Sequence, residues 1–470
     1  MTFLPLSRRL FLGASVAALG ACASRSRVHS PQPDPWARAE AIAAGVQRPR
    51  IPQRRFTITD FGGAGGGDAR PAIAAAFEAA EAAGGGRIVL PAGEWFCDGP
   101  VHFRSRCALH LEAGARLVFS GNPQSYLPVV FTRWEGTEVY NYSPLIYGRD
   151  LTDVAITGAG VIDGQGEKNF LPWRENQRPD QRALRRMGAE GAPVETRIFG
   201  EGHWLRPHFI QFLGCERVLV EDVTIADSPF WCVHPVYCRH VTVRGVTVMS
   251  KHINSDGVDP DSSEDVLIEK CAFDIGDDGV ALKAGRDQDG WRVARKTCRV
   301  VVRDCTFVGV RGGGMAIGSE MSGGVEDVFV ERYAMNKVHH GLYFKANLDR
   351  GGEIRNVYIR DIKIGEADTV LIFTNDYHSY RGGNFPTRFE DVLVENVQCR
   401  KAAVGMSIIG HVDAPVRRVT VRDMDVGAIE TPLQINHVED LVFERVMMGG
   451  EPVTAVLKTA PSTFQRPLKH

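Results

Sequence analysis

The sequence lacks any hydrophobic run of the roughly 18 to 20 residues that a membrane-spanning helix needs. It also lacks an excess of one charge: 55 Lys and Arg stand against 57 Asp and Glu, a net charge of -2. This balance gives no sign of nucleic acid or a membrane surface as a partner. No His, Cys or Asp spacing suggests a zinc site. The glycine-rich residues 62–67 lack the Gly-Lys-Ser/Thr ending of a phosphate-binding loop. We therefore expect no metal, no cofactor and no nucleic-acid partner.

The N-terminus has the pattern of a bacterial export signal. Residues 7–12 contain the paired arginines of a twin-arginine signal, and residues 19–22 (Leu-Gly-Ala-Cys) resemble a lipobox. We predict a signal over 1–22, lipidation of Cys22, and a tether over 23–52. The protein would then be lipid-anchored in the bacterial periplasm or on the outer-membrane surface. The alternative is an ordinary cleaved signal in which Cys22 is incidental.

Nine of the ten cysteines follow Cys22, and an oxidising compartment would allow disulfides. Plausible pairs are Cys97 with Cys107, and Cys232 with Cys238. Cys271 and Cys305 occupy equivalent places in a repeating pattern, where burial as free thiols is the favoured interpretation. The sequence alone assigns no pairing.

Glycine, at 50 residues, and proline, at 25, indicate many turns, and the segments between the turns repeat. Short strands, apolar at alternate positions, recur roughly every 22 to 35 residues. They begin at Val218, Val241, Val266, Val300, Val328, Val357, Val392, Val419 and Leu441. No helix-length periodic segment separates them, which disfavours alternating strands and helices. We predict an all-β fold over residues 53–470, a single-stranded right-handed parallel β-helix built coil on coil.

Two segments interrupt the repeat. Residues 69–83 have the one strong amphipathic helical pattern, with Asp68 as the expected N-cap, and we predict that this helix caps the first coil. Residues 163–207 form a long insertion with little strand pattern. Its arginines are Arg174, Arg178, Arg182, Arg185, Arg186, Arg197 and Arg206. Such a cluster could clamp carboxylates. The alternative is a solvated, partly disordered loop.

Three carboxylates stand in glycine-bracketed turns at the ends of short apolar runs. Asp256 lies in Asn-Ser-Asp-Gly (254–257), and Asp277 with Asp278 lies in Gly-Asp-Asp-Gly (276–279). In stacked coils these side chains would meet on one face. Because adjacent carboxyls raise the pKa of one of them, one can hold a proton near neutral pH. Such a cluster suits hydrolysis of a sugar–sugar bond, although each turn sequence alone also fits a plain coil corner.

Residues 56–445 resemble the family-28 glycoside hydrolases, the polygalacturonase family. Besides the aspartate motifs, the matching segments are Arg206-Pro207, Ser228-Pro229-Phe230-Trp231, His234-Pro235, Gly318-Ser319-Glu320 and Phe344-Lys345. The resemblance implies a right-handed parallel β-helix that hydrolyses α-linked galacturonic-acid glycosides of pectin with inversion. By this resemblance Asp277 is the general acid, and Asp256 and Asp278 activate water. An inverting pair would stand about 6.5–9.5 Å apart.

The resemblance also implies substrate-binding residues. Lys345 and Tyr377 match a lysine and a tyrosine that bind a substrate carboxylate, and Arg206 and Asn254 belong to matching motifs. The arginine-rich insertion would narrow one end of the cleft, which favours exo action on oligomers. We expect a monomer whose partner is a pectic oligo- or polysaccharide, with membrane contact only through the lipid anchor.

Two positions depart from the family pattern. The family's histidine beside the acid falls on Gly312, and its arginine near the lysine falls on Tyr343. His340, from the neighbouring coil, could supply the imidazole, and we place Tyr343 and His340 among the substrate-binding residues. The departures leave open rhamnogalacturonan or another branched pectin as the substrate. They also leave open a carbohydrate-binding protein without turnover, and a calcium-dependent pectate lyase on the same scaffold.

Overall fold

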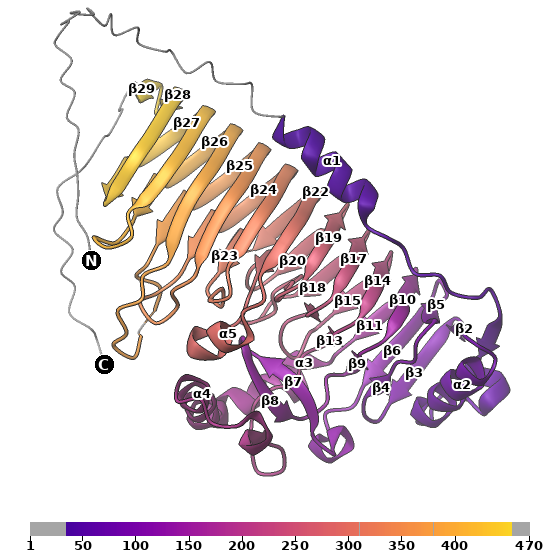
Figure 1. The fold of residues 1–470 in the computed structure, drawn as a ribbon. Helices are drawn as coiled ribbons and strands as arrows, with labels where there is room; N and C mark the ends of the chain where they lie inside the picture. Colours follow the sequence, from indigo (N-terminus) through magenta and orange to yellow (C-terminus); the bar gives the residue numbers. More distant parts are fainter. Residues whose placement is uncertain (1–33, 310, 379, 454–470) are drawn as a thin grey trace, which may run out of the picture. The chain divides into compact units, whose positions relative to one another are not determined.

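The chain winds into a right-handed parallel β-helix (Figure 1). The computed structural model describes residues 34–309, 311–378 and 380–453. The expected signal and Cys22 lie outside them. The first sheet contains β1 (Arg55–Thr57), β2 (Gly86–Leu90), β5 (Cys107–Leu111), β10 (Thr152–Gly158), β14 (Glu216–Glu221), β17 (Arg239–Arg244) and β19 (Glu264–Glu269). The second contains β3 (Gly93–Cys97), β6 (Ala115–Phe119), β11 (Val161–Asp163), β15 (Thr224–Ala226), β18 (Thr247–Ser250) and β20 (Ala272–Ile275).

The third sheet carries the strands that matter most for function. It contains β4 (Val101–His102), β9 (Ile146–Arg149), β13 (Ile210–Leu213), β16 (Val233–Val236), β21 (Val280–Leu282) and β23 (Gly313–Gly318). Later coils consist of longer strands that continue around the corners. These are β22 (Thr297–Gly309), β24 (Val325–Lys345), β25 (Glu353–Thr374), β26 (Arg388–Ile409), β27 (Val416–Asn436) and β28 (Val438–Met448), and the short β29 (Glu451–Val453) follows.

The stacking follows the predicted repeat. Val218 lies opposite Val241, Val241 lies opposite Val266, and the same column continues in register to Val419. These side chains are buried in one continuous core. Because each coil leaves its inner apolar face bare until the next coil covers it, stability accumulates along the axis. The predicted fold class is confirmed.

Helix α2 (Arg70–Ala82) covers the N-terminal end of the stack (Figure 1), as predicted. The N-cap, however, is Ala69 and not Asp68. The Asp68 carboxylate instead accepts hydrogen bonds from the backbone N–H groups of Arg70 and Asp98. It therefore joins the first helical turn to the chain that follows β3, a tertiary contact that the sequence pattern did not indicate.

All nine cysteines within the described residues are free thiols. This overturns the pairs that the sequence suggested, Cys97 with Cys107 and Cys232 with Cys238. The Cys238 thiol instead donates to the carbonyl oxygen of Phe212 at 3.2 Å, in a neighbouring coil. Cys271 and Cys305 are buried free thiols, as predicted.

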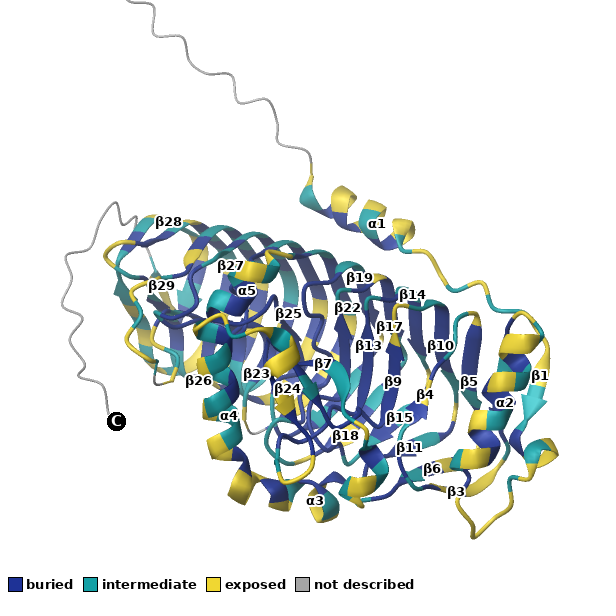
Figure 2. Ribbon diagram, turned by 60° about the horizontal axis from the view of Figure 1, so that its bottom comes forward, coloured by how far each residue is buried: buried dark blue, intermediate teal, exposed yellow. Residues whose placement is uncertain are grey.

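The segment expected to be a tether is, from Pro35 onward, packed on the β-helix. Helix α1 (Pro35–Gly45) lies along the outer face of the first sheet (Figure 2). Its buried face meets an outward-facing apolar cluster made of Leu267, Val301 and Phe329. The indole N–H of Trp36 donates to Glu395 at 2.9 Å. The alternating strand pattern hid this docking site, because outward positions were expected to be polar.

We expect Trp36→Ala to release α1 from the sheet. Trp36 is 7% exposed and packs edge-on against Phe329, and truncation of a buried tryptophan costs about 3 kcal/mol or more. Hydrogen exchange over residues 35–52 should then accelerate by roughly 100-fold while the coils stay protected. Trp36→Phe is the matched control, since it keeps most of the apolar contact. Unchanged exchange in Trp36→Ala would mean that the indole does not hold the helix.

The insertion at 163–207 contains regular structure, which argues against the alternative of a solvated, partly disordered loop. Its elements are α3 (Gly166–Asn169), a 3-10 turn (Leu171–Trp173), α4 (Arg174–Ala189), a second 3-10 turn (Val194–Thr196) and β12 (Ile198–Phe199). β12 pairs with the hairpin of β7 (Val130–Trp134) and β8 (Thr137–Asn141). The sequence concealed α4 because only Gln177, Leu184 and Gly188 are buried along it. α4, the hairpin and α5 (Asp287–Val293) gather beside the third sheet (Figure 1).

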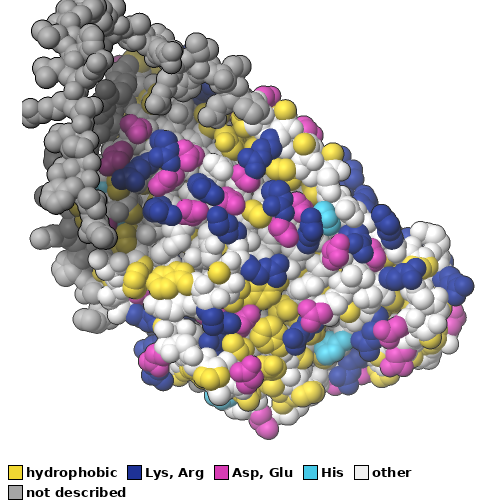
Figure 3. Space-filling view, in the orientation of Figure 1, with side chains coloured by type: hydrophobic (Ala, Val, Ile, Leu, Met, Phe, Trp, Pro, Cys, Tyr) yellow, Lys and Arg dark blue, Asp and Glu magenta, His cyan; other side chains and the backbone are white. Residues whose placement is uncertain are grey.

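The face of the molecule in Figure 3 has no dominant charge. Lys and Arg side chains alternate with Asp and Glu over the face in Figure 3. Several form ion pairs between neighbouring coils, such as Arg303 with Glu269 at 2.8 Å. Exposed pairs of this kind each contribute little to stability. Within the described part of the chain, no helix is both long and apolar enough to cross a bilayer.

Candidate active site

Three aspartates meet at the edge of the third sheet. Asp256 precedes Val258, Asp277 and Asp278 precede β21, and Val258 pairs with Val280 of that strand. This register sets Asp256 level with Asp278 of the next coil. One carboxylate oxygen from each aspartate lies within 4.8 Å of the other two. The structure therefore brings together the carboxylates that the repeat was expected to bring together.

Glycines allow the two aspartate turns to approach each other. A Cβ on Gly257 would stand 2.5 Å from the carbonyl oxygen of Gly279, and one on Gly279 would stand 2.5 Å from that of Gly314. Asn254 adopts a left-handed φ of 63° and directs its backbone N–H at Asp277 Oδ2, 2.8 Å away. The turns thus position the carboxylates as well as reversing the chain.

Asp277 and Asp278 have different surroundings. Asp278 is buried and is held by Lys345 Nζ at 2.5 Å and by the N–H of Gly313 at 2.6 Å. Asp277 is partly exposed and accepts from the N–H groups of Asn254 and Asp278. Burial raises the pKa of Asp277, and the adjacent Asp278 raises it further, while Lys345 opposes the shift. Asp277 is the carboxyl of the pair that is suited to hold a proton.

Lys283, just after β21, faces three buried carboxyls. Its Nζ lies 3.2 Å from Glu320 and 3.8 Å from both Asp256 and Asp259. Burial raises the pKa of Asp256 well above its ordinary value, and Asp259 and Asp277 add to the shift while Lys283 opposes it. The single ammonium group of Lys283 is therefore shared as an ion-pair partner by three carboxyls.

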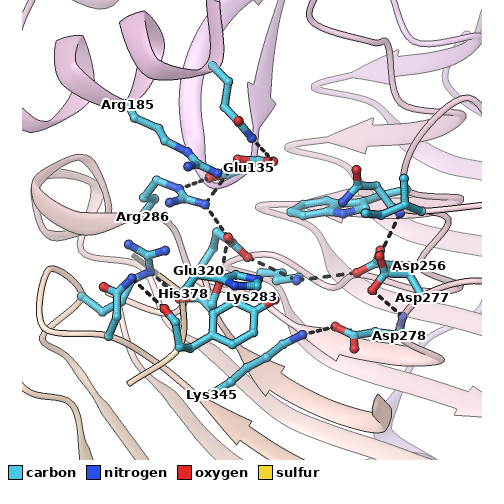
Figure 4. A pocket seen from close by; sticks show the side chains of 18 of the residues that line it. Glu135, Arg185, Asp256, Asp277, Asp278, Lys283, Arg286, Glu320, Lys345 and His378 are labelled. Atoms are coloured by element: carbon cyan, nitrogen blue, oxygen red, sulfur yellow. Dashed lines mark hydrogen bonds and ion pairs between the residues drawn. The ribbon is translucent and has the colours of Figure 1, made fainter. Parts of the chain in front are cut away.

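A chain of alternating charges leads from Lys283 to the opposite wall (Figure 4). Glu320 binds Arg286 at 2.6 Å, Arg286 reaches Glu135 at 3.3 Å, and Glu135 binds Arg185 of α4 at 2.6 Å. These side chains come from the β7–β8 turn, from α4 and from the segments after β21 and β23. Hydrogen bonds between charged groups are strong in a buried, low-dielectric site, and a network of them is rigid. The network from Glu320 to Arg185 therefore fixes the shape of the pocket wall opposite the aspartates.

These groups line a pocket of about 480 Å³. Its charged lining residues are Glu135, Arg174, Arg178, Arg185, Asp256, Asp277, Asp278, Lys283, Arg286, Glu320, Lys345 and Arg350. A wall with so many cations suits a hydrophilic, anionic ligand. Asp256, Asp277 and Asp278 also have a spacing that could admit a metal ion, but the ammonium groups of Lys283 and Lys345 already stand against these carboxylates.

The family model of the glycosyl hydrolases family 28 matches residues 112–443. The chain belongs to this family. A probable polygalacturonase of Vitis vinifera is 30% identical over 436 residues, covering 85% of this chain and 84% of the relative. An exo-poly-alpha-D-galacturonosidase of Dickeya chrysanthemi is 25% identical, and the match covers 73% of this chain and 61% of the relative. The structure of a hyperthermoactive exopolygalacturonase from Thermotoga maritima superposes with a TM-score of 0.83 at 36% identity, covering 87% of this chain and 96% of that one. The protein is therefore a glycosyl hydrolase.

Of the substrate-binding residues that the sequence suggested, Lys345, Tyr377 and Asn254 line the pocket. Tyr343 does not line it. Its ring centroid lies 4.9 Å from Lys345 Nζ, and that of Tyr377 lies 5.0 Å away. The two rings hold the ammonium group of Lys345 by cation–π contact. Tyr343 therefore contacts Lys345 from outside the pocket lining.

Arg206 is also absent from the pocket lining, so its expected contact with substrate stays a prediction without support from this geometry. It is fully buried, and its guanidinium donates to Gln177, to the carbonyl of Pro229 and to Asn254 Oδ1 at 2.7 Å. Burial and nearby Arg174 lower the pKa of Arg206 to about 9. Arg206 therefore orients Asn254, which in turn holds Asp277.

The structure explains why Gly312 carries no imidazole. Its φ is 67°, and a Cβ there would stand 2.6 Å from the backbone of both Asp277 and Asp278. His340 of β24 pairs with Gly313 of β23, in the preceding coil. It does not line the pocket. Burial and the neighbouring His339 lower the pKa of His340 to about 4, so its ring is neutral near neutral pH. A contact of His340 with substrate stays a prediction.

Several side chains that line the pocket were not predicted from the sequence. Lys283, Arg286, Glu135 and His378 line the pocket, yet each is a single charged or polar residue in an unremarkable loop or strand end. Only the register offers a signal: Lys283 and Lys345 occupy one outward column of the third sheet, two coils apart. A residue-by-residue alignment of the coils could have paired them.

Proposed function

We propose that this site hydrolyses α-linked galacturonic-acid units of pectin from a chain end, with inversion. The pocket carries this proposal, because aspartates form one side of it and cations from Lys283, Arg286 and α4 lie across from them (Figure 4). Each uronic-acid unit bears a carboxylate, which guanidinium and ammonium groups recognise. The names of the relatives, polygalacturonases and exopolygalacturonases, support the same substrate class.

In the proposed reaction Asp277 protonates the glycosidic oxygen. Asp256 and Asp278, level with each other in adjacent coils, hold the attacking water. The nearest oxygens of the acid Asp277 and of the two water-activating aspartates all lie within 4.8 Å of one another. This is closer than the about 6.5–9.5 Å between acid and base that is typical of inverting enzymes, so the expected spacing is not found. Inversion is proposed instead because two carboxylates face one water position while the third serves as the acid.

The leaving sugar would lie toward α4. Because the acid protonates the leaving oxygen, that sugar must be on the Asp277 side. Burial, Arg178 and Arg311 lower the pKa of Arg174, and Asp277 opposes this shift. Arg174 and Arg178 also line the pocket. The carboxylate of a galacturonate leaving group would meet these guanidinium groups.

Exo action is proposed because one end of the pocket is bridged. Arg381 donates to the carbonyl oxygen of Arg185 in α4 at 3.3 Å and to Asp287 of α5 at 2.8 Å. The Arg381 N–H also donates to Asp349 at 2.6 Å. The loop after β25 is thereby tied to both helices beside the pocket end that contains Arg185 and His378. A polymer threading through this end would have to break these bonds.

We expect Arg381→Ser to shift the products toward longer fragments. The bridge between the loop and α4 would loosen, so the fraction of di- and trigalacturonate should rise several-fold over wild type at equal conversion. Anion-exchange chromatography of early time points measures this. Arg388→Ser is the control, because Arg388 pairs with Glu353 and is exposed. An unchanged product pattern would argue that Arg381 does not close the pocket.

The proposed function is tested by incubating the protein with polygalacturonan and with rhamnogalacturonan. New reducing ends from polygalacturonan, without ultraviolet absorbance from a C4–C5 double bond and unaffected by EDTA, would support it. Activity on rhamnogalacturonan alone would move the substrate to branched pectin. A double bond or a calcium requirement would indicate a lyase, and binding without turnover would indicate a carbohydrate-binding role.

We further propose that the protein is an exported monomer, anchored through Cys22. Residues 1–22 support the export and the anchor, and the helix that caps the stack of coils supports the monomer. Metabolic labelling with a palmitate analogue tests it: label in wild type that is lost in Cys22→Ser supports the anchor. A wild-type protein that carries no label would favour an ordinary cleaved signal.

A further inference from the structure

Asp259 is a buried carboxyl close to the catalytic aspartates. It has no role in the proposed hydrolysis. It is 0% exposed, and it lies outside the pocket lining. Neither of its oxygens receives a hydrogen bond from an N–H or O–H group of the described residues. Its one ion-pair partner among the described residues is Lys283, whose Nζ lies 3.8 Å from Asp259 and also 3.8 Å from Asp256.

The local charges do not balance if every acid is ionised. The linked cations are three: Lys283, Arg286 and Arg185. The linked carboxyls are four: Asp256, Asp259, Glu320 and Glu135. Lys283 is closer to Glu320 than to either aspartate, so it compensates them only in part. One bound proton would make the group neutral.

Asp256 and Asp259 are both buried beside the same ammonium group. Two such carboxyls can hydrogen-bond to each other only if one of them carries a proton, since an ionised carboxylate is an acceptor alone. Like charges at such short range in a buried site repel strongly, which favours retention of that proton. Burial raises the pKa of Asp259 well above its ordinary value, with Lys283 opposing and Asp278 adding to the shift.

We propose that Asp256 and Asp259 share one proton at the pH of catalysis, with Asp259 as the positioning residue that donates it to Asp256. Asp256 thereby stays a carboxylate; it lines the pocket, and its buried Oδ1 has no hydrogen-bond partner among the described residues. As the water oxygen bonds to the anomeric carbon, Asp256 accepts the water proton. The proton between Asp259 and Asp256 stays in place, so it is not consumed. This inference rests on the role of Asp256 under Proposed function.

The first test compares Asp259→Asn with Asp259→Leu on polygalacturonan. The amide keeps a donor toward Asp256, whereas the isosteric leucine removes it. We expect the asparagine variant to keep kcat within about tenfold of wild type. The leucine variant should lose about 100-fold or more in kcat with little change in KM, the size of a general-base contribution. Equal losses in both variants, or full activity in the leucine variant, would overturn the proposal.

The second test needs no substrate, so it separates this inference from the proposed function. The infrared carbonyl band of protonated carboxyls is measured in wild type and in Asp259→Asn at neutral pH. We expect the asparagine variant to lose one protonated carboxyl, because Asp256 is then ionised. Asp153→Asn is the control. Burial alone would raise the pKa of Asp153, but its bonds to Arg217 lower it overall, so this variant should not alter the band. An unchanged band in Asp259→Asn would contradict the shared proton, whatever the substrate proves to be.

Discussion

Replacing Asp277 by Asn should lower kcat on polygalacturonan by about 1000-fold, with KM changed only a few-fold. The amide can still accept the bond from the Asn254 N–H, so the turn should keep its shape. What is lost is the proton delivered to the leaving oxygen, a contribution of about 100- to 10,000-fold in general acid catalysis. Steady-state kinetics and circular dichroism together separate this loss from misfolding.

An aryl galacturonide with a good leaving group provides the control for the acid role. Such a substrate needs little protonation, so Asp277→Asn should lose far less on it than on the polymer. Asp278→Asn should lose activity on both substrates, because water activation is required for each. If Asp277→Asn retained more than a tenth of the wild-type kcat on the polymer, Asp277 would not be the acid.

Replacing Lys345 by Met should lower kcat by about 100-fold or more and extend activity to higher pH. Lys345 binds the buried Asp278 at 2.5 Å, so without Lys345 this carboxylate loses the partner that holds it for water activation, and a positioned general base contributes about 100-fold or more. Lys345 also lowers the pKa of Asp277. Without it that pKa rises, the acid stays protonated at higher pH, and the alkaline limb of the kcat/KM profile moves upward.

The matched control for this variant is Lys337→Met, an exposed lysine on the same strand β24. Its pH profile should coincide with that of wild type. An alkaline limb in Lys345→Met that stays in place or moves to lower pH would contradict the link between Lys345 and Asp277. Unchanged kcat would mean that Asp278 does not need its ammonium partner.

The β-helix could be predicted because its determinant is local and repeated. Alternating apolar residues from Val218 to Val419 record the inward face of each coil, and the register follows them. Helix α1 could not be predicted, since it depends on outward apolar residues such as Leu267 and Val301, which one strand pattern cannot distinguish from core. α4 was missed because its buried side is narrow.

The site divides in a similar way. Asp256, Asp277 and Asp278 could be found because their glycine-bracketed turns are visible in a short window. Lys283 and the Glu135–Arg286 pair are joined only by contacts between distant segments, so no local pattern marks them. Arg206 shows the limit of a motif match. Its motif matches one expected to bind substrate, but the side chain is buried and donates a hydrogen bond to Asn254.

Proton NMR of the purified protein acting on trigalacturonate in the presence of EDTA tests the proposed hydrolysis most directly. We expect release of monogalacturonate, with the β-anomer appearing first because the α-linkage is inverted, and no alkene protons. Initial formation of the α-anomer would contradict inversion. Alkene signals, or no conversion of an oligomer that demonstrably binds, would contradict the claim that the three aspartates hydrolyse galacturonide bonds.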